Sequence, residues 1–166
     1  MDGDAPAVAP DVRTPALPQA VSPGRTAAAI FLGWLLPGAG HVLLGKVGRG
    51  IAFAALIFGS FGLGLAHDGR LALHDRRQPF LTALQVVANV GVGPADVLAR
   101  MSVYHEPAYV LPADYGDPRY DHRLGILRHR TESGRSIYGT AYLWTAGLMN
   151  LLLLFDVWDI GTGRKT

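Results

Sequence analysis

Three long apolar runs without a charged residue constrain this chain more than any other feature. They cover residues 27–44, 50–66 and 136–155, and they are 18, 17 and 20 residues long. An apolar helix of roughly 20 residues crosses the ~30 Å hydrocarbon core of a bilayer. Three such runs among 166 residues leave too little polar sequence to cover them in a soluble domain. The sequence therefore predicts an integral membrane protein with spans at about 27–44, 50–66 and 136–156.

A fourth uncharged stretch, residues 78–95, is less apolar. Its valines and leucines are interleaved with Gln85, Asn89 and Pro94, whose insertion costs roughly cancel the gain. We favour a fourth span over about 79–96, packed against the other helices. The alternative is a segment that dips in and returns, which is tolerated only where protein covers its backbone. The expected fold class is all-α, a polytopic helical membrane bundle of three or four spans with a helical hairpin in its N-terminal half.

The loop charges leave the orientation open. With four spans, Lys and Arg number seven on the side of the N-terminus and eight on the other. With three spans, and with residues 67–135 on the side of the N-terminus, the numbers are 11 and four. That arrangement would place the N-terminus in the cytoplasm, because cytoplasmic loops carry the excess of positive charge.

Two segments lie outside the predicted spans. Residues 1–25 contain five of the 11 prolines and no periodic apolar pattern, which predicts a disordered tail before a membrane domain over 26–166. Residues 101–135 hold five arginines, four tyrosines and three prolines and are expected to form a polar surface loop. Its basic part, residues 122–130, fits an amphipathic surface helix or a lipid phosphate contact, and we favour a plain solvated face.

Composition and motifs argue against several classes of function. Fifteen Lys and Arg against 13 Asp and Glu give a net charge of +2, too balanced for a nucleic-acid partner. The chain has no cysteine, which excludes disulfides and thiolate sites. The motifs of metalloproteases, serine hydrolases and phosphate-binding loops are missing from the sequence. We therefore expect no enzyme, no cofactor and no metal site.

The most patterned stretch is residues 33–50, GWLLPGAGHVLLGKVGRG. Pro37 cannot donate to the carbonyl of Gly33, and the glycines that follow let the backbone bend or let a neighbouring helix come close. The basic turn after them is short enough only for an antiparallel hairpin, and its cations are placed to meet lipid headgroups. The motif residues are Gly33, Pro37, Gly38, Gly40, His41, Gly45, Lys46, Gly48, Arg49 and Gly50.

This stretch resembles the hairpin of the two-transmembrane-helix (TM2-like) family and of related small bacterial membrane proteins of unknown function. Those hairpins have a P-G-x-G run followed by a G-K/R-x-G-R-G turn, which match Pro37, Gly38, Gly40 and residues 45–50. The C-terminal sequence is similar to the ending of uncharacterised bacterial membrane proteins that begin with such a hairpin; its distinctive residues are Gly139, Gly147, Asn150, Asp156 and Asp159. The resemblance implies a multi-pass protein, which we expect in the bacterial inner membrane, and implies no activity.

Four polar residues in or beside the spans are candidate functional groups, because polar side chains inside membranes are commonly functional. Asn150 is expected to form a hydrogen bond inside the bundle, with a substrate or ion contact as the alternative. His41 is expected to bond to backbone or to a neighbouring helix rather than to serve metal or proton chemistry. Asp156 and Asp159 flank Trp158, where an aromatic boundary belt is expected.

The function we expect is that of a non-enzymatic accessory or scaffold subunit, which acts by helix packing in a larger assembly or as a homo-oligomer. Small residues on the helix over 50–66 would let another helix approach; they are Ala52, Ala55, Gly59, Gly62 and Ala66. The expected partners are the lipid bilayer and other membrane subunits or a second copy. The alternative is a small transporter or channel with a polar path near His41, Asn150 and Asp156. An intramembrane enzyme would need two of His41, Asp156 and Asp159 within hydrogen-bond reach in a cleft.

Overall fold

The computed structural model describes residues 21–111 and 116–165, and every regular element within them is an α-helix. These helices are α1 (Pro23–Leu35), α2 (Ala39–Leu43), α3 (Val47–Ala66), α4 (Pro79–Val90), α5 (Pro94–Tyr104), α6 (Pro118–Glu132) and α7 (Ser136–Gly161). The predicted all-α fold class is therefore confirmed. The proposed disordered tail over 1–25 lies mostly outside the described residues, but its last part was wrong. Helix α1 begins at Pro23, because proline at the first helical position has a backbone already set for the helix.

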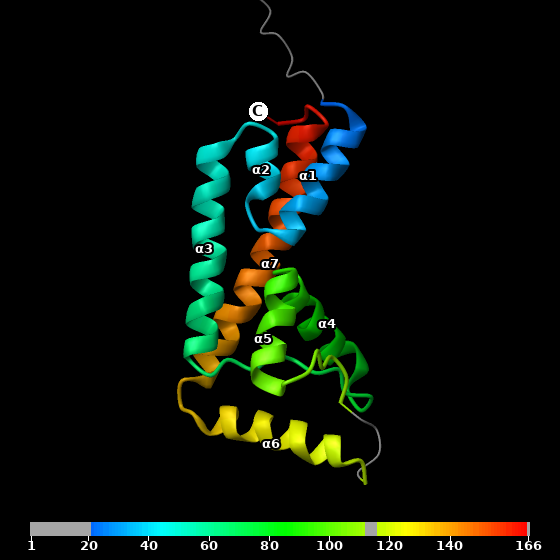
Figure 1. Cartoon of the computed structure of the whole chain (residues 1–166), viewed down its shortest axis with the longest axis vertical. Coiled ribbons are helices and arrows are strands. Elements are labelled where there is room, and N and C mark those ends of the chain that lie inside the picture. The colour runs from blue at the N-terminus through cyan, green and yellow to red at the C-terminus, as the bar shows by residue number, and fades with distance from the viewer. Residues whose placement is uncertain (1–20, 112–115, 166) are drawn as a thin grey trace, which may run out of the picture.

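Helices α3 and α7 form the long axis of the molecule (Figure 1). They have 20 and 26 residues, about 30 and 39 Å at 1.5 Å per residue, and both are long and apolar enough to cross a membrane. They lie against each other at glycines: a Cβ added to Gly64 would stand 2.7 Å from Leu143 Cγ, and one added to Gly139 would stand 2.8 Å from the carbonyl oxygen of Gly64. The second and last apolar runs of the sequence thus become the two full-length helices.

The first apolar run does not form one helix, so the continuous span predicted over 27–44 was wrong. Helix α1 stops before Pro37, Gly38 adopts a φ of 87°, and the short α2 runs back beside α1. The two helices are antiparallel, since Arg25 at the start of α1 donates to the carbonyl of Leu43 at the end of α2 at 2.8 Å. The physical reason is that proline has no N–H for the helix and that the left-handed backbone at residue 38 favours glycine.

The fourth uncharged stretch is not one straight helix, and its bend fits either a broken span or the dip-and-return alternative. Helices α4 and α5 are bent by 110° at residues 91–93. Gly93 has a φ of 76° and Pro94 begins α5. Both outer ends of the pair are bonded to the same loop region: the backbone N–H of Asp75 donates to Thr82 Oγ1 at 3.0 Å, and Tyr104 Oη donates to the carbonyl of Leu71 at 2.8 Å.

The two ends of the bundle differ. One end, here called the terminal end, contains the start of α1, the turn between α2 and α3, and the end of α7; the N–H of Val21 donates to the carbonyl of Gly161 there at 2.9 Å. The other end, the cap end, contains the loop over 67–78 and the described residues 105–111 and 116–135 (Figure 1). The described residues of 67–135 therefore lie away from the start of α1, and the three-span arrangement that placed them on the same side was wrong.

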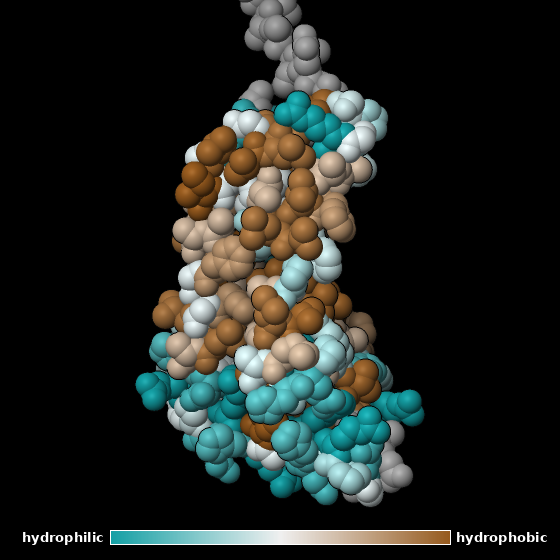
Figure 2. Space-filling view, viewed as in Figure 1, coloured by the Kyte–Doolittle hydropathy of each residue, from teal (hydrophilic) through white to brown (hydrophobic). Residues whose placement is uncertain are grey.

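Helix α6 covers the cap end, so the predicted polar loop over 101–135 was only partly right. Its N-terminus is defined by Asp117, whose carboxylate accepts from the N–H of Arg119 at 2.9 Å, and by a proline at the first helical position. Arg123 donates to the Glu106 carboxylate at 2.7 Å, a bond that lowers the pKa of Glu106. Arg130 donates to the carbonyl of Gly69 at 2.8 Å. Figure 2 shows hydrophilic surface over this end and a mainly apolar surface along the body of the molecule.

Candidate functional site at the hairpin tips

The tips of the two helix pairs meet beside the middle of α7, at Asn150. This side chain is fully buried, and its Nδ2 donates to the carbonyl of Gly33 at 3.3 Å and to the carbonyl of Gly91 at 2.9 Å. Gly33 lies near the C-terminal end of α1, and Gly91 is the residue that follows α4. One amide therefore satisfies a carbonyl at the end of each hairpin's first helix, where backbone acceptors lack helical partners. The expectation that Asn150 forms its hydrogen bonds inside the bundle is confirmed.

Backbone atoms touch directly around this amide. Trp34 Nε1 donates to the carbonyl of Val90 at 3.3 Å, joining the two tips. A Cβ added to Gly93 would stand 2.0 Å from the carbonyl oxygen of Trp34, and one added to Gly147 would stand 1.6 Å from that of Ala88. Only glycine fits at these two positions. The junction therefore depends on direct contact between the backbones of the two hairpins and between α4 and α7.

Two amides at this junction retain unused hydrogen-bonding capacity. Both side-chain polar atoms of Asn89, which is fully buried, and Oδ1 of Asn150 have no hydrogen-bond partner among the described residues. Buried polar groups are almost always paired with protein or water. The junction therefore contains three buried amide atoms that no described residue pairs with, and none of them is charged.

A second polar cluster joins α2 to α7 near the terminal end. His41 is 1% exposed, and its Nε2 lies 2.9 Å from Oδ2 of Asp156. The His41 ring also lies 5.2 Å from the Phe53 ring of α3, between centroids. Lys165 donates to the other carboxylate oxygen of Asp156. The sequence analysis singled out His41 and Asp156 separately, and the structure brings them together; Asp159 instead faces Arg164, with 3.9 Å between Oδ1 and Nη1.

Apolar packing separates this cluster from the Asn150 junction. Asn150 and Asp156 are six residues apart on α7, about 9 Å along the helix axis. Between them along α7, Leu154 packs against α1: a Cβ added to Gly33 would stand 3.1 Å from a methyl of Leu154. The described side chains therefore form two polar clusters with an apolar layer between them.

Replacing His41 tests the second cluster. His41→Ala is expected to lower the free energy of unfolding by about 1–3 kcal/mol, because a buried hydrogen bond between α2 and α7 is lost. Thermal unfolding in detergent measures this effect. His129→Ala on the exposed side of α6 is the matched control and should leave the unfolding midpoint unchanged. Equal midpoints for the two variants would show that the His41 bond does not hold α2 in place.

The remaining motif residues divide into packed and open positions. Gly38 and Gly50 are packed: a Cβ on Gly38 would stand 2.2 Å from the carbonyl oxygen of Gly50. Gly45, with a φ of 81°, and Gly48 have open space around them. Lys46 and Arg49 lie at the turn between α2 and α3, at the terminal end. The predicted hairpin turn is thus present, but its two arms are the five-residue α2 and the 20-residue α3.

Sequence reasoning missed the most buried ion pair. Asp96 and Arg100 of α5 are both 0% exposed, and Arg100 Nε donates to Asp96 Oδ2 at 2.8 Å. Arg100 also donates to the carbonyls of Ala72 at 2.9 Å and Ala108 at 2.6 Å, and its guanidinium lies 4.2 Å from the centre of the Tyr109 ring. Burial raises the pKa of Tyr109, and the nearby Asp96 raises it further. The signal in the sequence was an Asp and an Arg spaced i, i+4 directly after an uncharged stretch.

The described residues contain no group of three or more His, Asp or Glu side chains that could hold a metal ion. A family model of proteins of unknown function, DUF6677, matches residues 28–166, which is most of the chain. The chain belongs to the DUF6677 family. No curated protein and no solved structure matches it. The DUF6677 match includes both hairpin tips, the His41–Asp156 cluster and the two long helices, so all of them are features of the matched region.

Proposed function

We propose that this chain is a multi-pass protein of the bacterial inner membrane that acts without catalysis, as an accessory or scaffold subunit, through helix packing. The observation that supports this most is the outer face of α3. Six small residues recur on it at spacings of four and three, and all are exposed: Gly48, Ala52, Ala55, Gly59, Gly62 and Ala66. We call them the α3 stripe.

The α3 stripe lies opposite the face that packs inside the molecule. At 100° per residue, its members cluster around one direction, and the buried Ile57, Phe61 and Gly64 cluster about 180° away. A Cβ added to Gly59 or Gly62 would meet no atom within 4 Å. In a bilayer, helices associate through van der Waals packing, and small residues let two backbones come close. The stripe therefore suits a second helix, from another copy or from a different subunit.

Charge favours one orientation for the proposed arrangement. Among the described residues, the terminal end carries five Lys and Arg and the cap end carries eight. Cytoplasmic segments carry the excess of positive charge, so we place the cap end with α6 in the cytoplasm. The resemblance of residues 33–50 to a TM2-like hairpin supports a bacterial origin for the same proposal.

Substitution of small residues of the α3 stripe by large ones tests the proposal. Gly59→Leu and Gly62→Leu are expected to convert an assembled wild-type protein into single chains without unfolding it, because the added side chains project into open space. Size-exclusion chromatography and mass spectrometry after purification in mild detergent measure this. Leu56→Phe is the matched control, since it adds bulk to an exposed position of α3 beside the stripe. A wild-type protein that is a lone monomer with no co-purifying partner would overturn the proposal.

A small transporter or channel is the second candidate, and the hairpin tips are the observation that favours it. Membrane transporters bind their substrates at interrupted helices near the middle of the bilayer, and here α1–α2 and α4–α5 both break beside Asn150. The apolar packing of Leu154 against Gly33, between Asn150 and Asp156, argues against a continuous polar path. Solute flux into proteoliposomes that Asn150→Ala removes would favour this candidate over the scaffold.

A further inference from the structure

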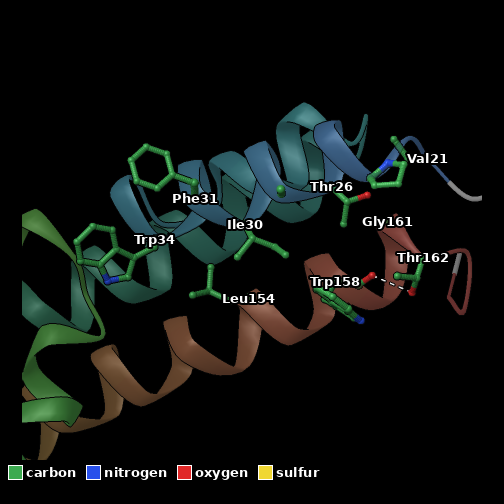
Figure 3. Close-up of a pocket in the computed structure, with 11 residues that line it drawn as sticks. Val21, Thr26, Ile30, Phe31, Trp34, Leu154, Trp158, Gly161 and Thr162 are labelled. Carbon is green, nitrogen blue, oxygen red and sulfur yellow. Dashed lines mark hydrogen bonds between the residues drawn. The ribbon is translucent and has the colours of Figure 1, made fainter.

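We infer that a groove between α1 and the C-terminal half of α7 binds one acyl chain of a bilayer phospholipid, with the phosphate at the terminal end. The groove encloses about 690 Å³ and is lined almost entirely by apolar side chains. Figure 3 shows Ile30 of α1 and Leu154 of α7 pointing toward each other in its middle. This site is separate from the α3 stripe and does not depend on the proposed function.

The groove has the length and direction of an acyl chain in one leaflet. Helix α1 has 13 residues, about 20 Å, which is long enough to pass through the ~15 Å of one leaflet of a ~30 Å hydrocarbon core. Trp34 lies at the deep end, where its indole N–H is fixed to the carbonyl of Val90 beside the middle of α7. The polar lining residues Thr26 and Thr162 lie toward the terminal end (Figure 3). An acyl chain placed here would run from headgroup depth to the centre of the bilayer.

Backbone contacts limit the groove to a narrow occupant. Near the terminal end, α1 and α7 touch at Gly161, where an added Cβ would stand 2.4 Å from a methyl of Thr26. Further along, Gly33 and Leu154 are in contact. An α-helix with its side chains is about 10 Å wide, a cross-section of about 80 Å², whereas about 690 Å³ spread along the ~20 Å of α1 leaves only about 35 Å². The contacts therefore favour a lipid chain over a partner helix.

Charge at the terminal end matches a phosphate. Arg164 follows the α7 side of the groove with a side chain that is 73% exposed, whereas Arg25 lies on the opposite face of α1 and donates to the carbonyl of Leu43 in α2. Asp159 lies 3.9 Å from Arg164 Nη1, too far for a direct hydrogen bond. Trp158 lines the same end, at the depth where tryptophan favours the headgroup boundary. Together these groups would hold an anionic headgroup above the apolar groove.

Native mass spectrometry of the full chain, purified from nanodiscs of phosphatidylglycerol and phosphatidylcholine into mild detergent, tests the inference. The wild type is expected to retain about one phospholipid per chain, mainly phosphatidylglycerol. Ile30→Trp fills the groove and should retain at least about tenfold less lipid. Leu148→Trp adds the same bulk at an exposed position of α7 outside the groove and should retain lipid as the wild type does.

Two further variants keep the outcome decisive if Ile30→Trp unfolds the protein. Leu154→Phe narrows the groove more gently and should also reduce retention, at an unchanged melting temperature. Arg164→Gln should remove the preference for phosphatidylglycerol while some phosphatidylcholine is still retained. The inference is overturned if the wild type retains no lipid, if both groove variants retain as much as the wild type, or if a second copy of the chain replaces the lipid in the spectra.

Discussion

Gly147→Leu is expected to release the α4–α5 hairpin from α7 and to lower the free energy of unfolding by more than about 3 kcal/mol. A Cβ at this position would stand 1.6 Å from the carbonyl oxygen of Ala88, and the obstacle is backbone rather than a flexible side chain. Moving α4 away to relieve the contact would also break the bond from Asn150 to Gly91. The variant thus loses close packing and leaves buried polar groups unpaired.

Thermal unfolding and limited proteolysis in detergent measure this effect. The expected result is a much lower unfolding midpoint, with new cleavage within residues 79–104. Gly59→Ala is the control, because a Cβ there meets no atom within 4 Å and alanine favours a helix over glycine. If Gly147→Leu melts with the wild type, the contact between α4 and α7 does not hold the hairpin.

Arg100→Met is expected to cost about 3–5 kcal/mol, because it leaves the carboxylate of Asp96 buried without its counter-charge. Both side chains are fully buried, and the guanidinium also ties the carbonyls of Ala72 and Ala108 to α5. Unfolding midpoints of Arg100→Met, Asp96→Asn and the double variant measure the coupling between the two residues. The double variant should be more stable than Arg100→Met, because the uncompensated charge is gone.

An exposed ion pair of the same chemistry is the control for this cycle. Arg119 and Asp117 lie 3.3 Å apart, and the Arg119 side chain is 71% exposed. Exposed pairs contribute little in water, so Arg119→Met should hardly change the midpoint. Equal effects of Arg119→Met and Arg100→Met would show that burial of the Asp96–Arg100 pair has no consequence for stability.

Much of the fold could be predicted from the sequence because a helix must be long and apolar enough to cross the hydrocarbon core of a bilayer. Both properties can be read from one short stretch of the chain. The runs that became α3 and α7 were recognised in this way. The first run has the same length and apolarity, yet it became α1 and α2. Pro37 and Gly38 indicated a bend, but whether the chain continues or turns back depends on what it can pack against. Here the return is stabilised by Gly40 lying against the carbonyl of Ala29 and by the bond from His41 to α7.

The candidate site was predicted as single residues rather than as an arrangement. Asn150, His41 and Asp156 were identified because polar groups are costly among apolar neighbours. Their partners lie more than 100 residues away in sequence, in the pairs Asn150–Gly33 and His41–Asp156. Asp96 and Arg100 were missed because a charged residue near the end of an apolar stretch resembles an ordinary helix boundary, and only the fold shows that both are buried.

The amino-acid sequence by itself determined that this chain is helical, which stretches avoid water, and which glycines and prolines interrupt them. These outcomes follow from backbone geometry and from the cost of exposing apolar groups, and each acts within a few residues. Tertiary structure alone decided that two interrupted helices bend, meet at Asn150 and leave a groove beside α7. Those features require backbone atoms from distant segments to come within van der Waals contact, and no local property of the chain specifies which segments will meet.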